Sequence, residues 1–271
     1  MSKLLRPSLL AAVAALVTAA ITACAGPPEQ PRSVTLAPTG DVRYGQLVFR
    51  DEFVGTSLGP AWTPLRGTAD YRHGGPFNPT KENQGFAAGQ VTLADGHLTL
   101  RAEPRPITVD GKTYPYTSGM VQSRDNFEFQ YGYLEFRMKV PQDRGHWPSA
   151  WLVGSVHEMA EIDVAEFLTD HTGRYGPMSN VHWGTDWATA KQWGLKILGA
   201  HDKDYAQDWH VYGLRWDAGA IQTYVDGVPG PRFEGANVPQ EPMYLIFNLS
   251  VHEGANPAPA TMLVDYVRIW K

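Results

Sequence analysis

Residues 160–167 read Ala-Glu-Ile-Asp-Val-Ala-Glu-Phe, a stretch that sets three carboxylates among apolar and strand-forming residues. Because the residues between the acids are those of a buried strand, the acids do not form a solvated charge run. Strand alternation puts Glu161 and Asp163 on the same face of a sheet. Glu166 would fall on the opposite face under strict alternation. A β-bulge at residues 164–165 would insert one residue and return Glu166 to the side of the other two acids.

Segments with the two-residue period of a strand lie on both sides of this stretch. The clearest are residues 96–102, 131–140, 210–216, 221–225 and 262–270, whereas residues 243–249 form a nearly continuous apolar run, typical of a strand covered on both faces. Only residues 189–198 carry a pattern compatible with a helix. The chain has 27 glycines and 21 prolines in 271 residues, about 18% compared with a background of roughly 12%. Such a composition is typical of many turns between short strands, so we predict an all-β, two-sheet antiparallel β-sandwich.

The composition excludes several other classes of protein. Nine tryptophans, twelve tyrosines and ten phenylalanines supply more apolar surface than a disordered chain carries. A single cysteine excludes a disulfide within the chain. The net charge of −5 opposes nucleic-acid binding, which needs a basic face. We therefore expect a globular protein, a monomer, with no nucleic-acid partner.

The N-terminus has the pattern of a secretory signal. Lys3 and Arg6 form a positive head before the apolar run at residues 9–21, which is too short to span a bilayer. The following Ile-Thr-Ala-Cys at residues 21–24 resembles the bacterial lipobox. That resemblance implies cleavage before Cys24, lipid on this cysteine, and an extracytoplasmic protein anchored to the cell membrane.

An alternative is cleavage after the small residues that flank Cys24, which would release a secreted protein. Cleavage before Cys24 makes residues 1–23 the predicted lipoprotein signal peptide. Residues 24–46 contain four prolines and few bulky apolar residues, so they are predicted to form an extended tether. Residues 47–271 suit one domain.

The Glu-x-Asp-x-x-Glu pattern of Glu161, Asp163 and Glu166 resembles glycoside hydrolase family 16. Other landmarks of that family follow in order at residues 49–53, 118–123, 131–137, 145–151, 210–216, 224–227 and 264–268. The resemblance covers residues 47–271. It implies a concanavalin-like jelly roll with a concave substrate groove.

Carried over by position, the resemblance implies Glu161 as nucleophile, Glu166 as general acid/base and Asp163 as the residue that assists both. The expected reaction is endo-cleavage of a polysaccharide with retention. Like-charge repulsion supports the division of roles, because it separates the pKa values of close carboxylates. The alternative is a calcium-binding or structural cluster of acids.

Aromatic and amide side chains are candidates for sugar contacts, because pyranose rings present flat C–H faces to aromatic planes. For each of them, core packing or a turn is the alternative role. The candidate substrate-binding residues are Trp147, Trp151, His182, Trp183, Asn83 and Asn248.

The two-residue spacer between Asp163 and Glu166 resembles laminarinases, agarases and carrageenases. We expect a β-1,3-glucan as substrate, although residues 248–254 lack the Gly-Gly and Trp usual in laminarinases. An agarase-type endo-β-galactanase and a non-catalytic, lectin-like polysaccharide-binding lipoprotein remain alternatives. The mechanism requires no metal or other cofactor. A structural calcium ion, as in some family members, would make Glu52 and Asp265 conceivable ligands.

Overall fold

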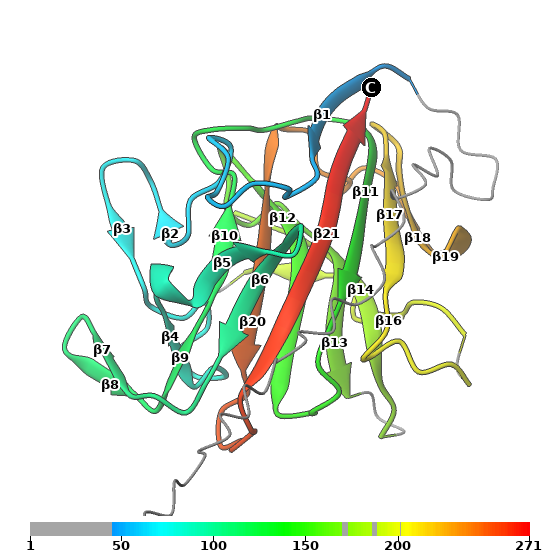
Figure 1. The fold of residues 1–271 in the computed structure, drawn as a ribbon. Helices are drawn as coiled ribbons and strands as arrows, with labels where there is room; N and C mark the ends of the chain where they lie inside the picture. Colours follow the sequence, from blue (N-terminus) through cyan, green and yellow to red (C-terminus); the bar gives the residue numbers. More distant parts are fainter. Residues whose placement is uncertain (1–44, 170–172, 186–188, 201) are drawn as a thin grey trace, which may run out of the picture. The chain divides into compact units, whose positions relative to one another are not determined.

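The computed structural model describes residues 45–169, 173–185, 189–200 and 202–271, all within one compact unit that spans residues 37–271 (Figure 1). The predicted signal peptide, Cys24 and all but the last two residues of the predicted tether lie outside the described residues. In the described part of the chain, no helix has both the length and the apolar character needed to cross a bilayer.

Two large antiparallel sheets form the body of the domain. The first has eight strands in the order β19-β18-β17-β11-β21-β6-β5, with β1 also paired to β21. Its strands are β1 (Leu47–Asp51), β5 (Val91–Ala94), β6 (His97–Ala102), β11 (Gly132–Lys139), β17 (His210–Trp216), β18 (Ala220–Val225), β19 (Val228–Glu234) and β21 (Ala260–Trp270).

The second sheet has seven strands in the order β10-β20-β12-β13-β14-β15, with β16 also paired to β14. Its strands are β10 (Met120–Gln122), β12 (His146–Gly154), β13 (Glu161–Thr169), β14 (Tyr175–Trp183), β15 (Lys191–Gln192), β16 (Lys196–Ile197) and β20 (Met243–Val251). The predicted two-sheet β-sandwich is confirmed. The helix suggested for residues 189–198 is wrong, because β15 and β16 lie there and extend the edge of the sheet beyond β14.

Three two-stranded pairs and one short 3₁₀ helix complete the fold. The antiparallel pairs are β2 (Arg66–Gly67) with β3 (Arg72–His73), and β7 (Ile107–Val109) with β8 (Lys112–Tyr114). The parallel pair is β4 (Gln84–Phe86) with β9 (Tyr116–Ser118), and the 3₁₀ helix is η1 (Ala88–Gln90).

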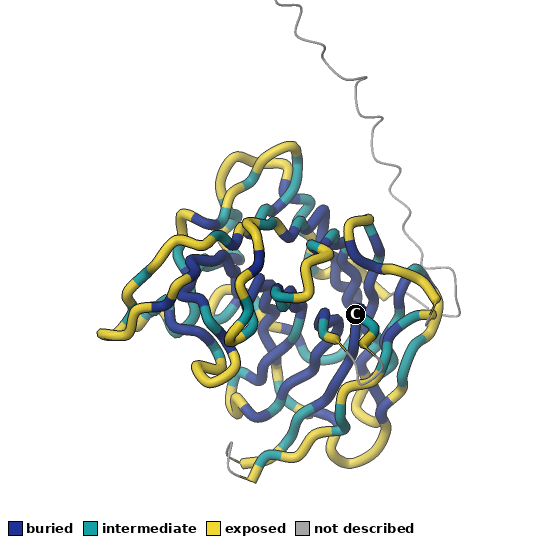
Figure 2. The backbone as a smooth tube through the Cα atoms, turned by 90° about the horizontal axis from the view of Figure 1, so that it is seen from below, coloured by how far each residue is buried: buried dark blue, intermediate teal, exposed yellow. Residues whose placement is uncertain are grey.

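The hydrophobic core lies between the two large sheets, where the strand centres are buried and the loops around them are exposed (Figure 2). Phe247 of β20 is fully buried there. Its ring meets that of Phe136 of β11 at 5.3 Å, and that of Trp62 at 5.9 Å. This contact joins the two sheets through aromatic packing.

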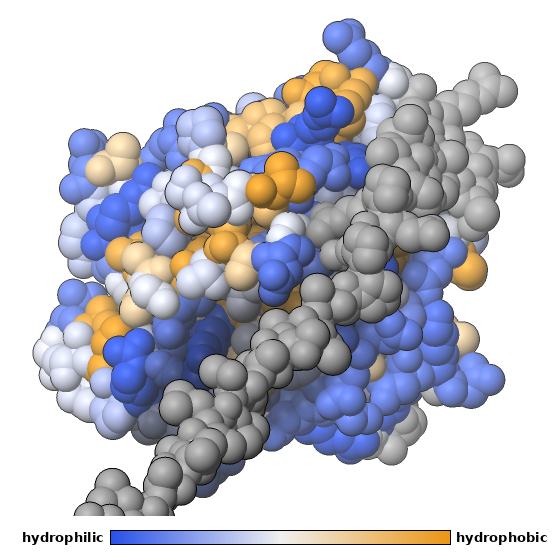
Figure 3. Space-filling model, viewed as in Figure 1, coloured by the Kyte–Doolittle hydropathy of each residue, from blue (hydrophilic) through white to orange (hydrophobic). Residues whose placement is uncertain are grey.

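Alternation along the central strands then sends every second side chain away from the core. On β12, Ala150 and Leu152 pack in the core, whereas Trp151 and Val153 line a cleft on the other side of the sheet. The face drawn in Figure 3 is mainly hydrophilic, and its hydrophobic residues form separate patches. Scattered apolar residues of this kind are normal on a soluble protein.

Replacing Phe247 by alanine should lower the free energy of unfolding by about 3–5 kcal/mol, because it leaves a cavity between the sheets. Urea denaturation followed by tryptophan fluorescence measures this change. Val228→Ala is the matched control, since this side chain is 59% exposed, and its effect should stay within about 0.5 kcal/mol. Equal effects of the two variants would contradict the assigned core.

Candidate active site

A β-bulge in β13 places the three carboxylates on one face of the second sheet. Ala150 of β12 pairs with Ala165, and the next residue of β12 pairs with Asp163, so Val164 has no partner on β12. The same irregularity appears against β14, between Asp163 and Glu166. Val164 and Ala165 therefore both face the core, and Glu166 returns to the cleft side. The predicted bulge is confirmed.

The cleft has a volume of about 840 Å³ and runs over one face of the second sheet, across its strands. Residues from β10, β20, β12, β13, β14 and β15 line it, together with the β2–β3 hairpin and the segment before β4. Because β13 lies in the interior of this strand order, its carboxylates have cleft surface on both sides.

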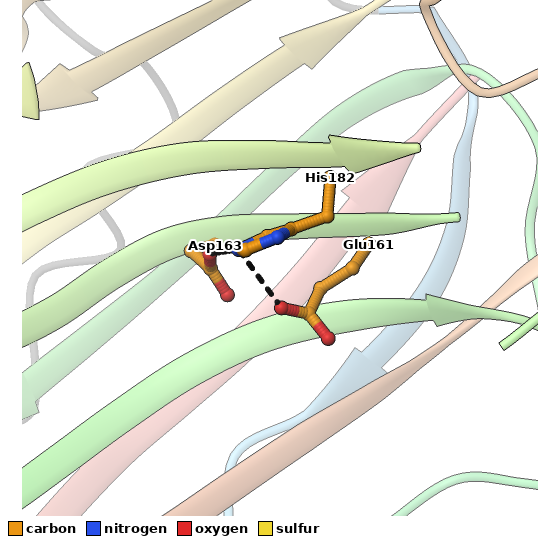
Figure 4. Close-up of side chains that lie close together, drawn as sticks. All are labelled: Glu161, Asp163 and His182. Carbon is orange, nitrogen blue, oxygen red and sulfur yellow. Dashed lines mark ion pairs between the residues drawn. The ribbon is translucent and has the colours of Figure 1, made fainter. Parts of the chain in front are cut away.

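Glu161, Asp163 and His182 form a close cluster on β13 and the neighbouring β14 (Figure 4). The His182 Nε2 atom lies 3.4 Å from Oε1 of Glu161 and 3.4 Å from Oδ2 of Asp163. Only 9% of Glu161 and 2% of Asp163 are exposed. His182 also lies 2.8 Å from the side-chain amide nitrogen of Asn180. The predicted position of His182 in the cleft is therefore confirmed.

Burial and mutual repulsion raise the pKa values of the carboxylates. Burial, then the charges of Asp163 and Glu166, hold the pKa of Glu161 well above its ordinary value. Burial and the charge of Asp163 do the same to the pKa of Glu166. Burial raises the pKa of Asp163 to about 7, although a hydrogen bond with Glu166 opposes the rise. The same bond raises the pKa of Glu166 and so adds to the effect of burial there.

Trp147 of β12 holds the carboxyl group of Glu166. Its indole N–H donates a hydrogen bond to Oε1 of Glu166 at 3.0 Å, and its ring stacks on His252 at 5.2 Å. This bond lowers the pKa of Glu166, against the larger effect of burial. Trp147 lines the cleft as predicted.

A hydrogen-bonded network continues the cleft wall toward β4. Trp151 donates its indole N–H to Oδ1 of Asn248 at 2.7 Å, and the Asn248 amide donates to Oγ of Ser250 at 2.9 Å. Ser250 in turn donates to Glu82 at 2.9 Å, and Gln84 donates to the same carboxylate at 2.5 Å. The predicted cleft positions of Trp151 and Asn248 are confirmed.

Two predicted substrate-binding residues lie elsewhere. Trp183 follows His182 on β14, so alternation turns it to the other side of the sheet, where its ring packs against Phe233 at 5.4 Å. Asn83 is not among the residues that line the cleft, whereas its neighbour Glu82 is. The structure therefore places neither Trp183 nor Asn83 in the lining of the cleft, and their predicted role in substrate binding stays a prediction.

Sequence reasoning missed Glu82, which is a buried carboxylate in the cleft wall. Burial raises the pKa of Glu82, and the hydrogen bonds from Gln84 and the backbone N–H of Asn78 oppose that rise. A signal was present: Glu82 and Gln84 are two residues apart and so share a face of an extended segment. Because residues 78–84 are almost all polar, they show no apolar alternation that would indicate which face is buried.

The conceivable calcium ligands Glu52 and Asp265 each pair with an arginine. Both oxygens of Glu52 accept hydrogen bonds from Arg268, at 2.9 and 2.8 Å, and Oδ2 of Asp265 accepts one from Arg137 at 2.8 Å. These guanidinium groups oppose binding of a divalent cation at either carboxylate. Within the described ranges, the group of potential metal ligands is instead the cluster in the cleft, whose three ligand atoms lie within 4.8 Å of one another.

The fold and the site define a jelly-roll protein whose second sheet carries a cleft with clustered carboxylates and aromatic rings. Residues 79–268 match the model of glycosyl hydrolases family 16, and the chain belongs to this family. The resemblance inferred from the sequence motifs is thereby confirmed at the level of the family.

Similar proteins include several glucanases. The chain is 30% identical over 258 residues to glucan endo-1,3-beta-glucosidase A1 of Niallia circulans, and the match covers 83% of this chain and 38% of that protein. A beta-glucanase of Rhodothermus marinus is 26% identical over 267 residues, covering 84% of this chain and 86% of that protein. At least seven curated relatives are longer proteins, of which the chain spans 34% to 51%.

A solved structure shares the fold. The catalytic domain of an endo-1,3-beta-glucanase (laminarinase) from Thermotoga petrophila RKU-1 superposes with a TM-score of 0.69 at 23% identity. The match covers 85% of this chain and 99% of that chain. It supports the two-sheet jelly roll described above.

The raised pKa of Asp163 makes stability depend on pH in a defined direction. Its folded-state pKa is about 7, compared with about 3.9 in an unfolded chain. The folded state therefore binds more protons across this range, and its stability is lost as pH rises from about 4 to about 7. The Asp163→Asn variant lacks this titrating group and should lose less free energy of unfolding over the same range. Its stability relative to the wild type should therefore increase with pH.

Urea unfolding of both proteins at about pH 4 and about pH 8 measures this difference. Asp202→Asn is the control, because the Asp202 side chain is exposed. The account is contradicted if Asp163→Asn gives the same stability difference at both pH values.

Proposed function

We propose that the chain is a retaining endo-β-glycosidase that hydrolyses a polysaccharide. One observation carries the proposal: the bulge in β13 brings Glu161 and Glu166 to the same face of the cleft, with Asp163 between them. Membership of family 16 supports it, since paired carboxylates are the chemistry of most glycoside hydrolases. The extent of the cleft across six strands favours a long substrate cut within its chain.

In the proposed reaction, an oxygen of Glu161 attacks the anomeric carbon as the bond to the leaving oxygen breaks. Glu166 gives its proton to that oxygen, and a glycosyl ester of Glu161 forms. A water molecule then gives a proton to Glu166 and attacks the same carbon. The ester bond breaks, Glu161 is released as a carboxylate, and the two inversions together retain the configuration.

The electrostatics of the site support these assignments. An acid needs a carboxyl that stays protonated near neutral pH, and burial together with Asp163 raises the pKa of Glu166 in that direction. A proton shared between Asp163 and Glu166 reduces the negative charge beside Glu161, which favours ionisation of the nucleophile. We assign Asp163 as the residue that positions this proton.

We propose a β-1,3-glucan as the substrate. Two of the similar proteins carry names that specify endo-1,3-beta cleavage, and the two-residue spacer before Glu166 agrees with a laminarinase-like enzyme. Trp147 and Trp151 supply aromatic planes in the cleft for the sugar rings. A galactan as substrate, or binding without hydrolysis, would be the alternative outcomes of a polysaccharide panel.

Two single variants should separate the roles of the glutamates. Glu166→Gln should lower kcat on the polysaccharide by about 10²–10⁴-fold, because protonation of the leaving oxygen is lost. On a dinitrophenyl β-glycoside, whose leaving group needs no proton, Glu166→Gln should still show a burst of phenolate release. Glu161→Gln should show no burst on either substrate, because no ester can form.

Glu234→Gln, on the exposed strand β19, is the matched control and should keep wild-type rates. Proton NMR of the first products gives the stereochemistry, and the β-anomer is expected from a β-linked substrate. An initial α-anomer, or a normal burst from Glu161→Gln, would overturn the mechanism. Tight binding of the polysaccharide by the wild type without new reducing ends would support the non-catalytic alternative.

We further propose that the protein is a lipoprotein of the cell envelope, on the strength of the lipobox-like sequence that ends at Cys24. Cys24→Ala should move the protein from the membrane fraction to the soluble extracytoplasmic fraction, because the acyl chains have no other attachment point. Immunoblots of the two fractions measure this change. An unchanged membrane fraction would contradict lipid attachment at Cys24.

A further inference from the structure

The β2–β3 hairpin forms part of the cleft wall but lies before the part of the chain that matches the family, which begins at residue 79. In Figure 1 the hairpin projects at the periphery of the domain, and its strand β2 contacts β10 at the edge of the second sheet. Arg66, Tyr71 and His73 of this region line the same cleft as the three carboxylates.

Local contacts fix the shape of the hairpin. Gly67 has a φ of +102°, and a Cβ atom there would lie 2.1 Å from the backbone oxygen of Tyr71, so glycine is required. The carbonyl of Gly67 accepts hydrogen bonds from Arg72 at 2.7 Å and from Gln122 of β10 at 2.6 Å. Asp125 also accepts a bond from the backbone N–H of Ala69 at 2.8 Å. The hairpin is thus tied to the sheet without any ligand.

This rigid hairpin presents an aromatic surface to the cleft. Tyr71 and His73 are two residues apart and share a face, with ring centroids 5.3 Å apart and an interplanar angle of 28°. Tyr71 is 59% exposed, although most large apolar side chains of the domain are buried. Nδ1 of His73 accepts a hydrogen bond from the backbone N–H of Gly75 at 3.3 Å, which fixes the orientation of the imidazole.

A cationic donor lies beside this surface. The guanidinium of Arg66 lies 4.4 Å from the ring centroid of Phe77 and donates a hydrogen bond to the carbonyl of Pro76. Arg66 lines the cleft, and the described residues form no ion pair with it, although the charges of Glu82 and Glu158 act on its guanidinium. An exposed ring with a nearby donor is the combination that binds a sugar residue.

We propose that Tyr71, stacked on His73, forms a distal subsite that takes a pyranose ring of the same polysaccharide, with Arg66 donating hydrogen bonds to its hydroxyl groups. The inference rests on the proposed function, because the cleft must bind a polysaccharide for this subsite to be filled. Contacts remote from the cleaved bond add affinity for long chains, which suits an enzyme that cuts within its substrate.

Binding of β-1,3-gluco-oligosaccharides of increasing length tests the subsite. Isothermal titration measures the affinity of three proteins that all carry Glu161→Gln, so that no substrate is consumed. They are the parent with Tyr71 intact, Tyr71→Ala and Tyr71→Phe. Beyond the length that reaches the hairpin, Tyr71→Ala should weaken binding by about tenfold. Shorter oligosaccharides should bind all three proteins equally. Tyr71→Phe keeps the ring and should match the parent at every length.

Thermal unfolding of each variant confirms that the domain is folded. Equal affinities of Tyr71→Ala and the parent at every length, or an equal loss at every length, would overturn the distal subsite. Neither result bears on hydrolysis, which is measured separately as the release of reducing ends from the same sugars by the wild-type protein. If the parent binds none of these oligosaccharides and the wild type releases no reducing ends from the polysaccharide, the proposed function itself fails, and the subsite with it.

Discussion

The position of Glu166 depends on one extra residue in β13. Strand alternation is a strict constraint, and without the bulge every side chain after Val164 would change sides. Glu166 would then enter the core, and Phe167, which packs against Tyr175 and Tyr212, would face the cleft. Because Val164 and Ala165 are small enough to face the core together, the strand keeps both its hydrophobic packing and its third carboxylate.

The same arrangement brings three carboxylates together at buried positions. Burial opposes the charged forms of Glu161, Asp163 and Glu166, and repulsion adds to this at the two glutamates, so the cluster destabilises the fold at neutral pH. The aromatic core between the sheets provides the stability that offsets this cost. Trp147 and His182 then orient the groups within the cleft. One face of these strands thus packs in the core and stabilises the fold, and the opposite face carries the residues of the cleft.

Much of this organisation could be predicted from the sequence, because alternating residues report directly which face of a strand is buried. The two sheets and the bulge before Glu166 follow from that rule. The same rule excludes Trp183 from the cleft, since a residue adjacent to His182 on a strand must face the other way. Alternation also places Glu82 and Gln84 on one face, but the position of Glu82 in the cleft wall depends on Ser250 of β20, and sequence alone does not show which distant strands meet.

The most direct test is a crystal structure of the Glu161→Gln variant with a bound β-1,3-gluco-oligosaccharide. The account predicts that Val164 bulges out of register and that the amide side chain replacing Glu161 lies beneath the anomeric carbon at the point of cleavage. It also predicts that the carboxyl group of Glu166 is hydrogen-bonded to the glycosidic oxygen. A Glu166 side chain directed between the sheets, or an oligosaccharide bound away from β13, would contradict it.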